Sequence, residues 1–116
     1  MSAISATALD LLTFFEVEPT LLDPNDPWPY TDAAYSVSQG VFDLSFAVAP
    51  AYKDVRIVLK VGGAALYELT ALGVVDVKYH EDNGRESLEV VTSESDRLFL
   101  RLKPTISLSH ECKRGS

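Results

Sequence analysis

From Gly40 onward, apolar residues recur at every second position of the chain, which is the pattern of strands with one buried face. One such run spans residues 42–48 and a second spans residues 55–61. Gly62-Gly63 separates the second run from a third, which contains Tyr67 and Leu69. The alternation predicts consecutive antiparallel strands, and a three-residue loop over 62–64 would place Leu59 opposite Tyr67 and Ile57 opposite Leu69.

The clearest predicted hairpin turns at Asn83-Gly84, because this dipeptide supplies the two positive-φ positions of a type I′ turn. Folding the chain about this turn aligns opposite charges with each other and apolar residues with each other. The expected pairs are Asp82 with Arg85, Glu81 with Glu86, Tyr79 with Leu88, Lys78 with Glu89, and Val77 with Val90.

The strand that follows is expected to join this hairpin through a three-residue loop over 94–96. That loop predicts two pairs, Val90 with Leu100 and Glu89 with Arg101. Lys78, Glu89 and Arg101 would then form a self-neutralising row of charges on a solvated face. On the same face Val91 would lie opposite Phe99, an apolar pair that the N-terminal segment or a second subunit would cover.

The first 39 residues follow no single period. Residues 5–12 are rich in Ala and Leu and predict a short helix capped by Ser5, although residues 13–17 have the composition of a strand. Residues 23–30 contain three prolines, which exclude both a helix and a central strand, so a structured loop is expected. A last short strand is predicted over 105–109, after Pro104.

About seven or eight short strands separated by turn signals are typical of two antiparallel sheets packed face to face. The chain is therefore predicted to be mainly β, an antiparallel β-sandwich with a short N-terminal helix. A single curved antiparallel sheet packed against that helix is the alternative. We expect one domain over 1–116, with an acidic segment at 1–39, a strand core at 40–110 and a frayed tail at 111–116.

The charge distribution is the most unusual feature of the composition. Residues 1–52 contain seven acidic residues and no Lys or Arg, whereas residues 53–116 contain ten acidic and ten basic residues. The formal net charge of −7 therefore belongs to the first 52 residues. Such a field repels nucleic acids and anionic lipids and attracts basic partners.

The sequence also bears on location. Cys112 is the one cysteine, which excludes an intramolecular disulfide and favours a reducing compartment. Residues 1–9 contain no basic residue, and Asp10 interrupts the apolar stretch that an export signal needs. No uncharged run is long enough to span a membrane. A cytoplasmic protein without membrane contact is expected.

No motif for catalysis or for a cofactor is present. The two histidines and Cys112 lack zinc-motif spacing, the chain has no G-x-S-x-G nucleophile elbow, and Gly62-Gly63 lies in a hairpin rather than in a phosphate-binding loop. We therefore expect a non-enzymatic protein with no cofactor and no metal. Calcium held by the acids of residues 23–32 is the remaining metal alternative, although the series lacks the glycine and final glutamate of an EF-hand.

The strongest candidate for a binding site is the proline-rich loop. It combines two aromatic residues with three acids on a stiffened backbone, and such aromatic residues dominate protein interfaces. Its predicted partner-binding residues are Asp23, Asp26, Trp28, Tyr30 and Asp32. Trp28 is alternatively a plug that closes one end of the sandwich. The like-charged hairpin pair Glu81 and Glu86 is a second candidate, which a basic group from a partner would neutralise.

In length, acidity, single-domain character and lack of a catalytic motif, the chain resembles the immunity proteins of bacterial toxin systems. The resemblance implies a cytoplasmic inhibitor that binds and masks a basic protein partner, such as a toxin. The alternative is a ligand-binding β-sandwich that stacks Trp28 and Tyr30 on a sugar, with calcium on the neighbouring acids. A homo-oligomer through the Val91 and Phe99 face is a further expectation.

Overall fold

The computed structural model describes residues 4–25, 30–103 and 105–112. Within these ranges one helix, α1 (Ala8–Phe15), precedes nine strands. The strands are β1 (Thr20–Leu21), β2 (Ala33–Gln39), β3 (Phe42–Ala49), β4 (Asp54–Val61), β5 (Ala64–Ala71), β6 (Asp76–Asp82), β7 (Arg85–Val91), β8 (Asp96–Arg101) and β9 (Ser107–Cys112). β9 therefore extends two residues into the segment expected to fray.

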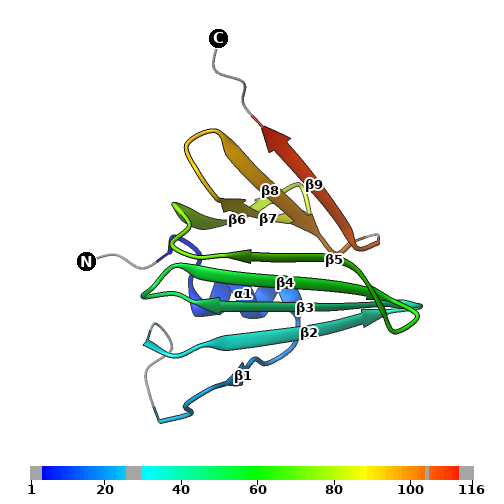
Figure 1. Ribbon diagram of the computed structural model, residues 1–116, viewed down its shortest axis with the longest axis horizontal. Coiled ribbons are helices and arrows are strands. Elements are labelled where there is room, and N and C mark those ends of the chain that lie inside the picture. The colour runs from blue at the N-terminus through cyan, green and yellow to red at the C-terminus, as the bar shows by residue number, and fades with distance from the viewer. Residues whose placement is uncertain (1–3, 26–29, 104, 113–116) are drawn as a thin grey trace.

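The strands form two antiparallel sheets, one with the order β1-β2-β3-β4-β5 and the other with the order β6-β7-β8-β9. The sheets pack as a sandwich, which confirms the predicted fold class. In Figure 1 α1 lies behind the five-stranded sheet, and it contacts β2, β6 and β7, so it bridges the two sheets along one side.

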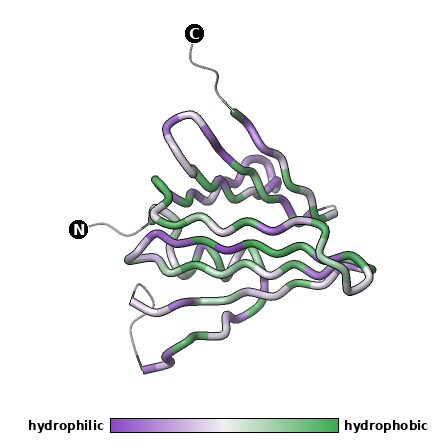
Figure 2. Tube along the Cα trace, in the orientation of Figure 1, coloured by the Kyte–Doolittle hydropathy of each residue, from purple (hydrophilic) through white to green (hydrophobic). Residues whose placement is uncertain are grey.

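The core lies between the sheets and beneath α1. Apolar and polar residues alternate along the strands in Figure 2, and the apolar set turns inward. Both sheets and the helix contribute fully buried side chains, among them Phe14, Tyr35, Phe46, Ile57, Leu88 and Leu100. Phe15 stacks on Tyr35 with ring centroids 4.8 Å apart and lies 5.2 Å from Phe46. The helix therefore contributes to the hydrophobic core together with the two sheets.

The helix begins later than predicted. Thr7, not Ser5, is its N-cap: the Asp10 amide donates to Oγ1 of Thr7 at 3.1 Å, and the Thr7 amide donates to Oδ2 of Asp10 at 3.0 Å. This capping box fixes the first turn. The strand-like residues Phe14 and Phe15 belong to the helix, because burying both rings outweighs their weak helix propensity.

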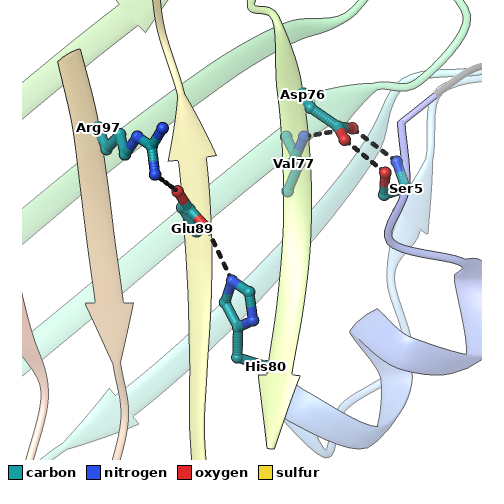
Figure 3. A network of polar contacts seen from close by, with 6 residues as sticks. All are labelled: Ser5, Asp76, Val77, His80, Glu89 and Arg97. Atoms are coloured by element: carbon teal, nitrogen blue, oxygen red, sulfur yellow. Dashed lines mark hydrogen bonds and ion pairs between the residues drawn. The ribbon is translucent and has the colours of Figure 1, made fainter. Parts of the chain in front are cut away.

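Ser5 has a different role, which is to fasten the N-terminal segment to the edge of β6. Its amide donates to Oδ1 of Asp76 at 2.7 Å, and its hydroxyl donates to Oδ2 of the same carboxylate (Figure 3). The Ala6 amide adds a bond to the carbonyl of Val77 at 2.8 Å. Partial burial alone would raise the pKa of Asp76, but the hydrogen bonds from Ser5 outweigh it and lower the pKa.

The predicted pairings around the two glycine turns are confirmed. β6 and β7 pair in the register fixed by Asn83-Gly84, both of which have positive φ. β4 and β5 pair Leu59 with Tyr67 and Ile57 with Leu69 as expected. Their loop is the two-residue Gly62-Gly63 turn rather than three residues, and a bulge between Leu59 and Lys60 restores the predicted register.

The predicted register between β7 and β8 is wrong by two residues. Val90 lies opposite Leu98 rather than Leu100, and Glu89 lies opposite Phe99 rather than Arg101. The reason is the turn, which begins one residue earlier, at Ser93, whose hydroxyl accepts from the Asp96 amide at 3.1 Å. A shift of two residues keeps every side chain on its own face. The β8 residues therefore point to the faces of the sheet that were predicted.

The shift changes the outer face of the four-stranded sheet. Lys78 and Arg101 are exposed as predicted, but Glu89 is only 4% exposed and does not belong to a solvated charge row. Its carboxylate contacts Nε2 of His80 at 2.7 Å and accepts from Arg97 at 3.1 Å, both diagonal neighbours (Figure 3). The side chains of the flanking strands β6 and β8 thus bury a paired carboxylate.

The expected pairing of Val91 with Phe99 is also wrong, since Val91 lies opposite Arg97 and Phe99 lies opposite Glu89. Val91 is 7% exposed within the single chain. The neighbouring side chains already cover most of this residue, which leaves little of it for a second subunit.

Candidate protein-binding surface

The proline-rich loop joins β1 to β2 at the edge of the five-stranded sheet. Asp23 begins it: its carboxylate accepts from the Asn25 amide at 3.0 Å, and its own amide donates to the buried Thr31 hydroxyl at 3.0 Å. Tyr30 is 66% exposed, as a residue available to a partner must be. Two predicted site residues, Asp26 and Trp28, lie outside the described residues. The choice between anchor and plug for Trp28 therefore stays a prediction.

Asp32, the last acid of the loop, pairs with Arg56 of β4. This ion pair ties the loop to the outer face of the five-stranded sheet. The carboxylate of Asp32 is thereby neutralised within the chain, so the acidic character of the loop rests on the acids that precede it.

Glu81 and Glu86 lie opposite each other at the end of the β6–β7 hairpin, as predicted. Each carboxylate has a hydrogen-bond donor from the same chain. Glu81 accepts from the Gly84 amide at 2.8 Å, and Glu86 accepts from the phenol of Tyr79 at 2.5 Å. These bonds explain how the hairpin tolerates two like charges, and they give both acids a structural role without any partner.

The Tyr79–Glu86 bond yields a prediction about alkaline pH. The hydrogen bond to Glu86 raises the pKa of Tyr79 from 10.0 to about 12. The folded chain therefore holds this proton more tightly than the unfolded chain, so the stabilisation is complete below about pH 10 and is lost as the pH rises through about 12. A tyrosinate absorbance titration of the folded protein should show a step near 12 that Glu86→Gln moves toward 10.

Glu81→Gln is the matched control for this titration, because Glu81 contributes only a weaker charge interaction to the same shift. It should leave most of the step near 12 in place. Identical curves for Glu86→Gln and the unmodified protein would show that the phenol does not donate to Glu86 in solution.

Four of the six acids that the structure describes within residues 1–52 lack a cationic partner. Asp32 pairs with Arg56 and Glu16 pairs with Lys103, while Asp10 and Asp43 accept hydrogen bonds from neutral donors of the same segment. Glu18 has neither an ion pair nor a hydrogen bond among the described residues. The fold therefore leaves the N-terminal part of the surface with an uncompensated negative charge.

An apolar groove beside these acids was missed by the sequence reasoning. It lies between α1 and the segment that enters β1, has a volume of about 470 Å³, and is lined by Ala8, Leu9, Leu12, Glu18, Pro19, Leu21 and Tyr35. We call it the α1–β1 groove. One signal was present in the sequence: the helix is apolar on both faces, with Leu11, Phe14 and Phe15 buried and Leu9 and Leu12 left outside.

The described residues offer little for metal or thiol chemistry. No group of three or more His, Cys, Asp or Glu side chains gathers there in a way that would hold a metal ion. The calcium alternative depends on Asp26, and the sugar alternative on Trp28, both outside the described ranges. The Cys112 thiol is exposed, and its hydrogen bond to Asp96 raises its pKa, which disfavours the reactive thiolate.

Membrane insertion through a helix finds no support in the part of the chain that the structure describes, where no helix is both long and apolar enough to cross a bilayer.

Comparison with known proteins gives one informative result. No protein-family model matches the chain, and no curated protein matches it by sequence. Among solved structures, it is similar to a chain of a contact-dependent growth inhibition toxin–immunity protein complex from Klebsiella pneumoniae 342. The TM-score is 0.78 at 16% sequence identity, and the match covers 96% of this chain and 98% of that chain. The two chains share a fold over nearly their whole lengths.

Proposed function

We propose that this chain is an immunity-type protein, which binds a toxin more basic than itself and neutralises it. The observation that carries the proposal is the fold shared with a chain of a toxin–immunity protein complex. The inhibitory role suits the present chain better than the toxic one, because the sequence contains no catalytic motif and its net charge of −7 favours contact with a basic partner. The lone thiol Cys112 is in keeping with action in the cytoplasm.

The charge asymmetry supports a basic partner in particular. An acidic surface speeds the encounter with a basic protein and discourages association with acidic ones. Residues 1–52 contain seven acids and no Lys or Arg, so we place the partner on that side of the molecule. Asp23, Asp26, Trp28 and Tyr30 are its proposed contacts, whereas the internal bonds of Asp32, Glu81 and Glu86 argue for a structural role.

The test begins with the reading frame immediately upstream of this gene: if it encodes a toxin-like protein, the toxic domain is purified in an inactivated form and its binding to this chain is measured. We expect a complex whose association rate falls steeply as salt rises, because exposed charges steer the encounter. Asp23→Asn with Asp26→Asn should slow association and flatten this salt dependence.

The matched control is Glu68→Gln with Glu94→Gln, which removes the same charge from two exposed acids outside residues 1–52. It should leave most of the association rate intact. The absence of a toxin-like reading frame beside the gene, or a neighbouring product that does not bind, would contradict the proposed function.

A further inference from the structure

The α1–β1 groove has the shape of a receptor for a side chain. Tyr35, 1% exposed, forms its floor, while Leu9 and Leu12 of α1 stand at its wall with 70% and 38% of their surfaces exposed. Pro19 and Leu21 form the facing wall. Exposed leucines beside a hollow with a mainly apolar lining are unfavourable in water, and such patches commonly mark interaction sites.

The charges around the groove have one sign. Glu18, which lines it, has no ion pair or hydrogen bond within the described part of the chain. The sequence supplies no Lys or Arg before Lys53. Lys103 approaches the end of α1 from the C-terminal part of the chain, but it is already paired with Glu16. A ligand for this groove therefore combines apolar and positively charged groups.

Two other occupants fit less well. A second copy of this chain docked symmetrically would bring Glu18 toward its own counterpart, and like charges in an interface are costly. An added β-strand would need a free row of backbone groups, but β1 has two residues and Pro19 before it has no amide hydrogen. The groove is suited to a side chain rather than to a strand.

We infer that the α1–β1 groove receives an apolar anchor side chain of the toxin, carried on a segment in which a flanking Lys or Arg meets Glu18. This inference rests on the proposed function and specifies the contact surface. A large apolar side chain seated on Tyr35 and enclosed by leucines loses its water, and such buried anchors carry most of the energy of an interface. Glu18 orients the segment and speeds its arrival.

The experiment uses the full chain and the inactivated toxin domain identified in the test of the proposed function, with dissociation and association rates measured separately. Leu9→Ser with Leu12→Ser should raise the dissociation rate by about 30-fold or more, which is the loss expected when a central anchor contact is removed. Glu18→Lys should chiefly slow association. Both leucines are exposed, so thermal melts should show that the variants stay folded.

Leu66→Ser with Leu72→Ser is the matched control, since these leucines are 65% and 74% exposed and lie outside the groove. It should leave both rates unchanged. If the toxin domain binds the unmodified chain and the groove variant equally well, the groove inference is wrong while the proposed function stands. If the unmodified chain does not bind, the proposed function fails and the inference fails with it. A dimer of this chain that the groove variant dissociates would identify the groove as a self-association surface and overturn the inference.

Discussion

Phe15→Ala is expected to destabilise the protein by about 3 to 5 kcal/mol, the usual cost of deleting a buried phenyl ring. Phe15 is 3% exposed, and its ring contacts Phe14, Tyr35 and Phe46 at centroid distances of 4.9, 4.8 and 5.2 Å. The ring therefore joins α1 to the five-stranded sheet. Its loss leaves a cavity where helix and sheet meet, and neither can close it without moving the other.

Urea denaturation of the variant would measure this cost. Leu12→Ala is the control on the same helix, because Leu12 is 38% exposed and its truncation should cost about 1 kcal/mol or less. A cost for Phe15→Ala as small as that of Leu12→Ala would mean that α1 is not part of the core in solution.

The second large effect concerns Glu89. Removing its two hydrogen-bond donors should destabilise the protein more than removing the carboxylate itself. His80→Phe with Arg97→Met preserves most of the apolar cover over Glu89 but takes away both donors, which leaves a buried carboxylate without a counter-charge. That change should destabilise by about 3 kcal/mol or more. Glu89→Met should cost less than about 1 kcal/mol, because His80 and Arg97 have 47% exposed side chains that water can solvate.

The same denaturation experiment tests whether the cost comes from keeping water away from the Glu89 carboxylate. His80→Ala with Arg97→Ala admits water to Glu89 and should therefore cost less than the Phe and Met pair. Equal costs for removing the carboxylate and removing its two donors would contradict the burial of Glu89.

The local signals in the sequence predicted those parts of the fold in which geometry is decided by neighbouring residues. Asn83-Gly84 permits one tight turn, so every pair between β6 and β7 followed from it. The turn at Ser93 depends instead on side-chain hydrogen bonds that alternation does not reveal, and the register was wrong there. The start of the helix was missed for a similar reason, because Ser5 and Thr7 are both good caps and Asp76, a residue distant in sequence, decides between them.

The candidate surface was predictable in its charge but not in its shape. The acids of residues 1–52 can be counted in the sequence, whereas the internal bonds of Asp32 and Glu86 depend on partners brought close by folding. The α1–β1 groove needs Tyr35 beneath α1 and Pro19 beside it, a juxtaposition that three separate segments create. The leucines on both faces of the helix were the one local sign of it.

The most direct test of the proposed function is growth protection in living cells. The toxin domain identified beside the gene is produced in its active form in a bacterial host, with or without this chain from a second inducible gene. We expect growth to stop with the toxin alone and to resume when this chain is produced with it, and we expect the Leu9→Ser, Leu12→Ser variant to protect less at equal amounts of protein. Continued growth arrest in the presence of folded, unmodified chain at levels at or above those of the toxin would contradict the proposed function.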